Sequence, residues 1–444
     1  MKVLLISTNS LPAAPSGPVY LAGAVRQAGH EVRIFERLFA ADLSGELSAQ
    51  LRDFQPDVVG LSIRLVFGDE VDPAAPLGTR HTDLRPRVRE IVAVARQSSR
   101  ARIVAGGPGF NYYAREWLDY LGLDYGIRGE GEQAFPLFLK RLEEGGDTGS
   151  IPGCVFRRNG GFQAVSPCPV QDLDAQALPA YDLLDWQPYA ESRITPVILT
   201  KRGCAFLCTY CPYGKLEGRR YRLKSPGRVL AEARSLLQAT GSRRVMFCDN
   251  NFNAPRRHAE AICKALVSEE LDLQWGTGDL RPSGVSDEFC RLMADSGCFS
   301  VNLSIESASE SMLQRMKRGY SVRQVRDALE AMSRSGIPFG ASLMLGAPGE
   351  TPETIAETLD VLGGYEIPNG VWVTIGVYLW TAYQDVVIEA RREGYLKEDQ
   401  DLFNGCVYLS PALPGPYLKE LLVDLRSRKG YTVQINKPHA GWTL

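Results

Sequence analysis

Three cysteines stand close together in the sequence, at positions 204, 208 and 211 of the stretch CAFLCTYC. Thiolates are common protein ligands of zinc and the usual ligands of iron–sulfur clusters. A structural zinc site requires four ligands, commonly as two separated pairs, and no second cysteine pair lies nearby. Three thiolates on a cubic iron–sulfur cluster would leave one iron open. The spacing therefore favours a cluster with one free coordination position.

The composition places few other limits on function. The chain has 444 residues, a formal net charge of −2 and 44% hydrophobic residues, which predicts two or three ordinary domains. Mixed charge gives no indication of nucleic-acid or anionic-membrane binding. The start MKVLLISTNS does not have the pattern of a signal peptide, and no apolar run approaches ~18 residues. We therefore expect a cytoplasmic protein whose ten cysteines stay reduced or bind metal.

The cysteine stretch follows the first of six short apolar runs that alternate with helical patterns. These runs cover residues 197–200, 244–250, 273–277, 299–306, 339–346 and 370–378. Six such repeats predict a partial (β/α)6 barrel over residues 195–378, smaller than the closed eight-unit barrel. Barrel sites lie at the carboxyl ends of the strands, so the cysteines fall at the expected active face. Residues 379–444 contain one clear helix, 385–394, and are expected to form an irregular cap.

The preceding residues predict a separate α/β domain. Residues 1–144 alternate five strand-like and helix-like segments, as in a Rossmann-like parallel sheet with helices on both faces. Ligands of such sheets bind at the carboxyl ends of the strands. Residues 145–194 are expected to be a connector with a hairpin that turns at Asn159, Gly160 and Gly161.

The cysteine stretch resembles the cluster loop of radical S-adenosylmethionine (SAM) enzymes, with the aromatic Tyr210 just before the third cysteine. This resemblance implies that Cys204, Cys208 and Cys211 hold a 4Fe–4S cluster whose open iron binds SAM. Reduction would then cleave SAM to methionine and a 5′-deoxyadenosyl radical, with an electron donor such as flavodoxin or ferredoxin. The cofactors supply the difficult chemistry, and the protein positions them.

Other strand ends match segments with which the family binds SAM. The expected cofactor contacts are Asp249, Asn250 and Asn251 in FCDNNF, Ser304, Glu306 and Ser307 in NLSIESAS, and Gly346 and Gly349 in LMLGAPGET. Alternative readings are a helix-capping Asp/Asn cluster, a surface ion pair of Glu306, and a plain turn in which Thr351 caps the next helix. The sixth strand departs from the relatives, which often carry a Pro-Gly turn there. Tyr378 and Trp380 line the substrate pocket in one interpretation and belong to the core in the other.

The first domain, in this order with a barrel, resembles the cobalamin-binding domain of one radical SAM subfamily. The matching stretches are PSGPVYLAGAVRQAGHEV, DVVGLS, VAGGP and YGIRGEGE. The resemblance implies that cobalamin lies over the strand ends and faces the SAM site. Its expected contacts are Ser62, Arg64, Gly106, Gly107, Pro108, Gly129 and Glu130.

One departure concerns the lower face of cobalt. The motif D-x-H-x-x-G is absent, and the chain has only His30, His81, His258 and His439. Cobalamin would therefore bind without a histidine ligand from the protein. The alternative is a domain that has lost cobalamin, in which the glycines and Arg64 are only architecture.

Three functions are compatible with these residues. The leading hypothesis is a cobalamin-dependent radical SAM methyltransferase that methylates an unactivated carbon of a small natural-product substrate. The second is a radical SAM enzyme with a non-methylating reaction, such as a rearrangement, cyclisation, oxidation or transfer of another SAM fragment. The third is a non-catalytic cobalamin or redox sensor, which three rather than four cysteines disfavour.

Overall fold

The computed structural model describes residues 1–10, 13–71, 79–269 and 271–436. The chain divides into two compact units. The first unit comprises Met1–Pro196 with Ala231–Ser242, and the second comprises Val197–Leu230 with Arg243–Leu444. The expected domain limits at 144, 194 and 378 stay predictions.

The first unit is built on a seven-stranded sheet in the order β2-β1-β3-β6-β7-β8-β9. The first five of these are parallel and match the five expected runs: β1 (Lys2–Ser7), β2 (Glu31–Glu36), β3 (Val58–Ser62), β6 (Arg102–Gly106) and β7 (Tyr125–Ile127). In β1, every residue after Lys2 is buried, as expected for a strand covered on both faces. The expected Rossmann-like sheet is confirmed.

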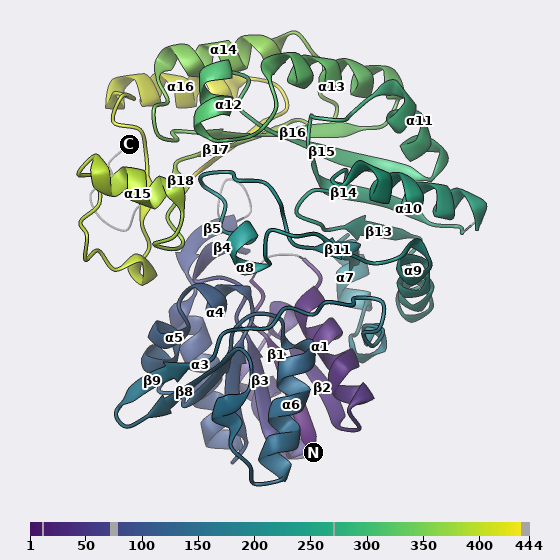
Figure 1. Ribbon diagram of the computed structural model, residues 1–444, viewed down its shortest axis with the longest axis vertical. Helices are drawn as coiled ribbons and strands as arrows, with labels where there is room; N and C mark the ends of the chain where they lie inside the picture. The colour runs from purple at the N-terminus through teal and green to yellow at the C-terminus, as the bar shows by residue number, and fades with distance from the viewer. Residues whose placement is uncertain (11–12, 72–78, 270, 437–444) are drawn as a thin grey trace. The chain divides into compact units, whose positions relative to one another are not determined.

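Helices connect the parallel strands and cover the sheet (Figure 1). They are α1 (Ser16–Gln27), α2 (Leu43–Phe54), α3 (Arg85–Ser98), α4 (Pro108–Tyr112), α5 (Ala114–Leu121) and α6 (Gly131–Glu143). Helix α1 packs against α6, whereas α3 packs against both α2 and α5. Right-handed crossovers put α1 on the face opposite to α2 and α3, because the chain reverses direction along the sheet after β2. The sequence did not predict the hairpin of β4 (Phe67–Val71) and β5 (Thr79–Asp83).

The expected hairpin of the connector is confirmed, and it extends the sheet of the first unit. Strands β8 (Cys154–Arg158) and β9 (Gly161–Ala164) are antiparallel and turn at Asn159 and Gly160, both with positive φ. Strand β8 pairs with β7. Further along the connector lies α7 (Gln187–Glu191). The connector also crosses α1 at Gly23, where a Cβ atom would collide with the carbonyl of Leu178.

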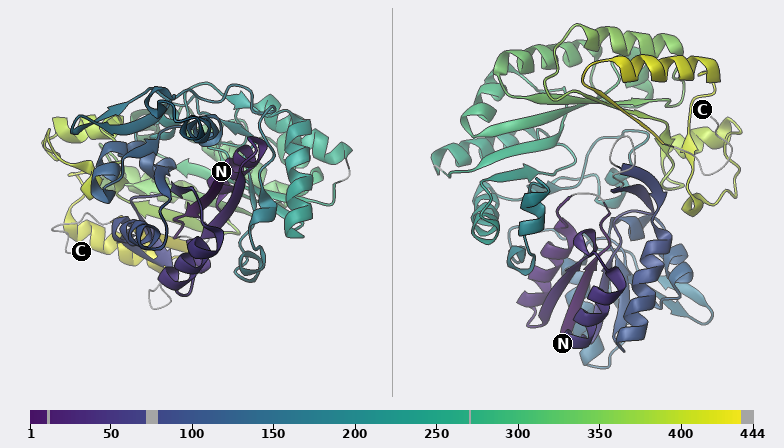
Figure 2. Two further views of the ribbon diagram at one scale, coloured as in Figure 1. Left: turned by 90° about the horizontal axis from the view of Figure 1, so that it is seen from below. Right: turned by 180° about the vertical axis from the view of Figure 1, so that it is seen from behind.

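The second unit contains a seven-stranded parallel sheet in the order β10-β13-β14-β15-β16-β17-β20. The six expected strands are present as β10 (Val197–Ile198), β13 (Arg244–Phe247), β14 (Gln274–Leu280), β15 (Cys298–Glu306), β16 (Phe339–Leu345) and β17 (Val371–Ile375). Figures 1 and 2 show its helices along one face of this sheet. They are α10 (Arg256–Ser268), α11 (Asp287–Asp295), α12 (Glu310–Arg315), α13 (Val322–Ser335), α14 (Pro352–Gly363) and α16 (Gly415–Ser427). Helix α9 (Pro226–Thr240) spans the division between the units.

The last part of the chain is more regular than expected. Helix α15 (Asp385–Arg392) confirms the one predicted helix, and β18 (Val377–Tyr378) pairs with β19 (Val407–Tyr408). The expectation of an irregular cap is wrong for α16 and β20 (Tyr431–Ile435), because β20 adds a seventh strand beside β17. The stretch YTVQI has the β-branched alternation of a strand. Residues 437–444, including His439, lie outside the described residues.

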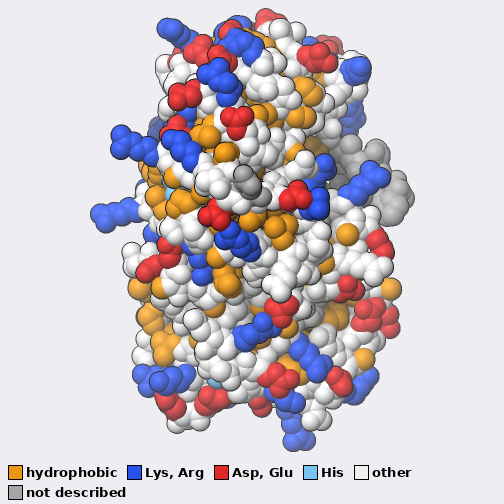
Figure 3. Space-filling model, turned by 90° about the vertical axis from the view of Figure 1, so that its right-hand side faces the viewer, with side chains coloured by type: hydrophobic (Ala, Val, Ile, Leu, Met, Phe, Trp, Pro, Cys, Tyr) orange, Lys and Arg blue, Asp and Glu red, His pale blue; other side chains and the backbone are white. Residues whose placement is uncertain are grey.

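Surface charge agrees with the near-neutral composition. Lysine and arginine side chains are interspersed with aspartate and glutamate on the face shown in Figure 3. Among the described residues, no helix is both long enough and apolar enough to cross a membrane.

Candidate active site

The three cysteines lie in a loop whose two ends are joined. Strand β11 (Lys201–Arg202) pairs with β12 (Arg222–Leu223) in antiparallel fashion and closes the loop of residues 203–221, here called the cysteine loop. The loop also contains the short helix α8 (Tyr213–Leu216). Gly203 begins the loop with φ of 88°, and a Cβ atom there would collide with the carbonyl of Arg220. The Cys204 amide donates to the Gly218 carbonyl at 3.0 Å.

The thiols are partly enclosed and interact with one another. Cys204 is buried, and Cys208 and Cys211 are half-buried. Burial raises the pKa of Cys204, and burial together with the neighbouring thiols raises the pKa of Cys211 to about 12. The Cys204 and Cys211 thiols therefore stay protonated unless a cation compensates the charge of the thiolate.

The donor set fits an iron–sulfur cluster. Within the described ranges, no group of three or more His, Cys, Asp or Glu side chains could hold one metal ion. A cubic cluster binds each thiolate at a different iron, so its ligands stand wider apart than those of a single ion. The Nε and Nη1 atoms of Arg281, whose charge acts on Cys204 and Cys208, are buried without a hydrogen-bond partner. A buried cation of this kind requires an anionic neighbour.

Asp249 anchors the entry to the cysteine loop. Its carboxylate accepts the Thr200 amide at 2.7 Å, the Thr200 hydroxyl, and the Lys201 ammonium at 2.7 Å. The side chains of Asp249 and Lys201 are 0% and 2% exposed. The acceptor positions of this expected SAM contact are thus occupied by the chain itself.

The two asparagines after Asp249 also point to the loop. Asn250 donates to the Glu217 carboxylate at 2.8 Å, and the same carboxylate oxygen accepts the Gly203 amide at 3.1 Å. Asn251 Nδ2 lies 3.8 Å from the Cys204 sulfur. None of them caps α10, whose N-cap residue is Pro255. The segment FCDNNF therefore supports the cysteine loop through these contacts.

Glu306 occupies an irregular strand end. Ser304 pairs with Ser342, and Glu306 pairs with the next residue, Leu343, so Ile305 forms a bulge. Glu306 has φ of 64°, a region that non-glycine residues seldom adopt. Desolvation raises its pKa, and the charge of Arg318 opposes this rise.

Arg318 links the bulge to the cysteine loop. It is 5% exposed, and it donates to the Ser304 carbonyl at 2.6 Å and the Tyr210 hydroxyl at 2.7 Å. Its Nη1 also lies 3.3 Å from the Cys208 sulfur. The structure therefore brings Cys208, Tyr210 and the end of β15 together around one guanidinium.

The two serines of NLSIESAS have different surroundings. The Ser304 hydroxyl donates to the Asp279 carboxylate at 2.8 Å, and desolvation raises the pKa of Asp279. Ser307 is fully buried, and its hydroxyl lies 3.0 Å from that of Thr358 on α14. Ser304 thus lies beside the Asp279 carboxylate at the strand ends, whereas Ser307 joins the end of β15 to α14.

The glycine segment after β16 makes a tight turn. Gly346 and Gly349 have φ of 91° and 80°. Glu350, fully buried, accepts the Gly346 amide at 3.2 Å and the Thr354 hydroxyl at 3.0 Å. Burial raises the pKa of Glu350 to about 7. Thr351 caps α14, so that part of the plain-turn interpretation is confirmed.

Tyr378 and Trp380 lie beside each other after β17, with ring centroids 4.8 Å apart. Both side chains are half-buried. The Trp380 amide donates to Gln384 Oε1 at 2.6 Å, and Gln384 Nε2 donates to the Tyr210 carbonyl. The aromatic pair is therefore tied to the cysteine loop through one glutamine.

The carboxyl edge of the first sheet carries the other expected contacts. Arg64 Nη1 donates to Asn9 Oδ1 at 2.8 Å, which joins the ends of β1 and β3. A Cβ atom at Gly107 would lie 2.6 Å from the Ile63 carbonyl, and one at Gly129 would lie 2.7 Å from Pro167. These two glycines are required by close packing of the chain.

The remaining expected contacts at this edge are Ser62 at the end of β3, Gly106 at the end of β6, the exposed Pro108, and Glu130, which accepts the Val170 amide at 2.8 Å. Polar side chains and backbone groups of this edge fit the amide-rich periphery of a corrin.

One histidine of the first unit lies away from this edge. His30 precedes β2 at the amino edge, where its Nδ1 lies 3.2 Å from the N-terminal amine. His258 belongs to α10 of the second unit and contacts the Lys224 carbonyl at 2.8 Å. The His30 side chain could therefore not lie under a cobalt at the carboxyl edge of the first sheet.

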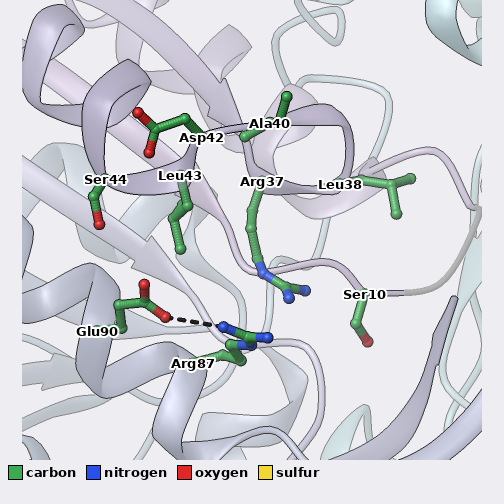
Figure 4. A pocket seen from close by; sticks show the side chains of 10 residues that line it. Ser10, Arg37, Leu38, Ala40, Asp42, Leu43, Ser44, Arg87 and Glu90 are labelled. Atoms are coloured by element: carbon green, nitrogen blue, oxygen red, sulfur yellow. Dashed lines mark hydrogen bonds and ion pairs between the residues drawn. The ribbon is translucent and has the colours of Figure 1, made fainter. Parts of the chain in front are cut away.

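A hollow in the first unit lies between the ends of β1 and β2 and the starts of α2 and α3. Its lining consists of Ser10, Arg37, Leu38, Ala40, Ala41, Asp42, Leu43, Ser44, Arg87 and Glu90. Figure 4 shows the guanidinium groups of Arg37 and Arg87 entering it from opposite walls, with Arg87 paired to Glu90 at 3.3 Å. It contains none of the expected cobalamin contacts.

Sequence reasoning missed four side chains that organise the cysteine loop: Glu217, Arg281, Arg318 and Tyr320. Arg318 and Tyr320 belong to the stretch RMKRGY, in which isolated charges resemble a helix surface. They can be recognised only in the folded chain, where this turn lies against the end of β15.

Comparisons with known proteins agree with both units. Residues 198–362 match the family model described as the radical SAM superfamily, and residues 3–139 match the B12 binding domain. An uncharacterized methyltransferase, PH0819 of Pyrococcus horikoshii, is 28% identical over 350 residues, which cover 78% of this chain and 72% of the relative. The anaerobic magnesium-protoporphyrin IX monomethyl ester cyclase of Rubrivivax gelatinosus is 24% identical over 78% of this chain and 61% of its own length.

A solved structure has the same fold. It is the radical SAM methyltransferase TsrM from Kitasatospora setae with tryptophan substrate and a SAM analogue bound. The similarity covers 95% of this chain and 88% of that chain, with a TM-score of 0.82 and 23% identity. The expected order of a Rossmann-like domain followed by a radical SAM domain is confirmed.

Proposed function

Because the chain belongs to the radical SAM enzymes that carry a B12-binding domain, we propose that it methylates an unactivated carbon of a small molecule. The observation that carries this proposal is the closed cysteine loop in the same chain as a B12-binding domain. Two similar proteins with methyltransferase names, PH0819 and TsrM, support methyl transfer as the reaction.

The residues of the second unit have distinct proposed roles. Cys204, Cys208 and Cys211 would hold a 4Fe–4S cluster, which supplies the electron that cleaves SAM, while cobalamin supplies the methyl carrier. Arg318 and Asn251 hold the cysteine loop in place through their contacts with cysteine sulfur. The proposal keeps the remaining expected SAM contacts at the strand ends: Tyr210, Asn250, Ser304, Glu306, Ser307, Gly346 and Gly349. Asp249, whose acceptor positions the chain itself occupies, is proposed to position the cysteine loop instead.

The substrate side of the site is proposed to include Tyr378 and Trp380. The tilted pair of rings presents a half-buried aromatic surface tied to Tyr210 through Gln384. Such a surface suits a flat or apolar small molecule and helps to exclude water from a reactive carbon. The tryptophan substrate of TsrM supports a small-molecule acceptor.

Cobalamin is proposed to bind at the carboxyl edge of the first sheet. Its contacts would come from Ser62, Arg64, Gly106, Pro108 and Glu130, together with the tight turns at Gly107 and Gly129. Because His30 lies at the amino edge of this sheet, it would not coordinate cobalt. An external one-electron donor such as flavodoxin or ferredoxin, and a cytoplasmic location, complete the proposal.

A non-methylating reaction is the second candidate. The observation that favours it is the similarity to a cyclase, which covers as much of this chain as the similarity to PH0819. The cysteine loop would have the same role in both cases, so the product distinguishes them.

The test begins with anaerobic reconstitution with iron, sulfide and cobalamin. We expect about four irons and about one cobalt per chain. With SAM that carries a deuterated methyl group, mass spectrometry should find the label in a small-molecule product. A modified product without the label would overturn methyl transfer in favour of the second candidate.

Substitution of the cysteines tests the site itself. Alanine at Cys204, Cys208 and Cys211 together should abolish iron binding and SAM cleavage. The matched control is Cys168→Ala, because Cys168 is exposed and lies in the first unit. SAM cleavage that survives in the triple variant would overturn the assignment.

A further inference from the structure

Arg281 is held against the cysteine loop from the end of β14. The side chain is 1% exposed, and its guanidinium lies 3.4 Å from the ring centroid of Phe206, two residues after Cys204. Its backbone is fixed by Asn253, which accepts the Arg281 amide at 3.0 Å and donates to its carbonyl at 2.9 Å. This positively charged group is thus fixed in both its main chain and its side chain.

The guanidinium is mostly unpaired. Nη2 donates to the Arg318 carbonyl, whereas Nε and Nη1 are buried and have no hydrogen-bond partner among the described residues. No carboxylate of the described chain forms an ion pair with Arg281. An uncompensated buried charge is destabilising, and proteins normally pair such a charge with an anion. The second buried cation beside it, Arg318, increases this cost.

The cysteine loop can supply the missing anion. Three thiolates and a cubic iron–sulfur cluster carry a net negative charge, which increases when the cluster is reduced. A fixed positive charge in a water-poor site stabilises the reduced form more than the oxidised form. Net charge and hydrogen bonds to sulfur are two of the properties that set the reduction potential of such clusters.

We infer that Arg281 supplies the buried positive charge that offsets the cluster held by Cys204, Cys208 and Cys211 and raises its reduction potential. This inference rests on the proposed function, because it requires the cluster. Arg281 is a positioning residue, since it acts through the cluster and contacts no reacting atom. Arg318, which already has four hydrogen-bond partners, has a different role.

The test compares Arg281→Met and Arg281→Lys with the wild-type chain. A matched control is Arg244→Met, because Arg244 stacks 4.9 Å above Phe299 at the amino end of β13, at the opposite edge of the same sheet. The midpoint potential of the reconstituted cluster is measured by spectroscopic titration without SAM. We expect at least a tenfold loss in the equilibrium constant for reduction in Arg281→Met, a decrease of about 59 mV for a one-electron couple. Arg281→Lys should show a smaller decrease, and the control none.

The cluster-free protein gives a second, independent measurement. Without a cluster, Arg281→Met removes an unpaired buried charge, so its melting temperature should equal or exceed that of the wild-type protein. A clearly lower melting temperature would mean that the chain itself balances this charge, and it would overturn the inference. This measurement also decides the matter if Arg281→Met folds but loses its iron.

Two further outcomes are informative. An unchanged midpoint potential in Arg281→Met with a full complement of iron would overturn the inference. If this variant also bound SAM more weakly, Arg281 would instead be a SAM contact. If the wild-type chain itself binds no iron, the proposed function has failed. Normal loading without an effect of Arg281 would contradict the inference alone.

Discussion

Substitution of Asp249 tests whether this residue positions the cysteine loop or contacts SAM. Asp249→Asn keeps an acceptor for the Thr200 amide but leaves the Lys201 ammonium without its carboxylate, 2.7 Å away. Both side chains of the pair are almost completely buried. The substitution therefore leaves one cation uncompensated at the entry to the loop.

The expected magnitude follows from this burial. Removal of one partner from a buried ion pair costs about 3–5 kcal/mol. Since about 1.4 kcal/mol corresponds to a factor of ten, local opening at Thr200 and Lys201 should become on the order of 100-fold more frequent, or more. A double variant, Lys201→Met with Asp249→Leu, should recover much of this loss, because replacement of both partners by apolar groups is often near neutral.

Hydrogen–deuterium exchange of a peptide that covers residues 199–211 measures this opening in the cluster-free chain. The control is Asp287→Asn, which breaks the exposed pair between Asp287 and Arg334 and should cost less than about 1 kcal/mol. Iron content after reconstitution should fall only in Asp249→Asn. Unchanged exchange and iron content, with SAM affinity at least about tenfold weaker, would refute the positioning role and make Asp249 a direct contact.

Two further predictions concern the turns beside the site. Gly203→Ala should lower iron content after reconstitution, because its Cβ atom would collide with the Arg220 carbonyl; Gly218→Ala, with similar φ but open space, is the control. Glu350→Gln should flatten the pH dependence of unfolding by urea. Burial raises the pKa of Glu350 to about 7, so the native state retains a proton that the unfolded state releases near pH 4.5. The free energy of unfolding of the wild-type protein therefore decreases by about 3 kcal/mol as pH rises from about 4.5 to 7. Equal iron content in Gly203→Ala and Gly218→Ala would contradict the first argument. An unchanged pH dependence of unfolding in Glu350→Gln would contradict the second.

Periodicity was sufficient to predict most of the fold. Buried runs such as KVLLIS alternate with amphipathic helices, so the parallel sheets of both units were visible in the sequence. Strand β20 was missed because YTVQI is short and lies at the end of a segment without a repeated pattern. The hairpin β4–β5 was missed because FGDEV and TRHTD are polar. Both elements depend on partners that the local pattern does not specify.

The candidate site was only partly predictable. The spacing of the three cysteines was sufficient to predict a cluster site, because a cluster needs several thiolates on one short loop. Glu217 and Arg281 cannot be recognised in this way, since one acidic and one basic residue are ordinary in any sequence. Their importance comes from burial and from the atoms around them, which only the folded chain supplies.

The bulge in β15 shows how such contacts couple separate motifs. Because Ile305 is an extra residue in the strand, the carbonyls at the bulge accept other donors: the Tyr320 hydroxyl lies 2.9 Å from the Ser304 carbonyl and 2.7 Å from the Ile305 carbonyl. Arg318 from the same turn also donates to Ser304 and reaches Cys208. The turn after α12 thus fixes both the left-handed backbone of Glu306 and one edge of the cysteine loop. A change in this turn would therefore disturb the proposed SAM contact and the cluster together.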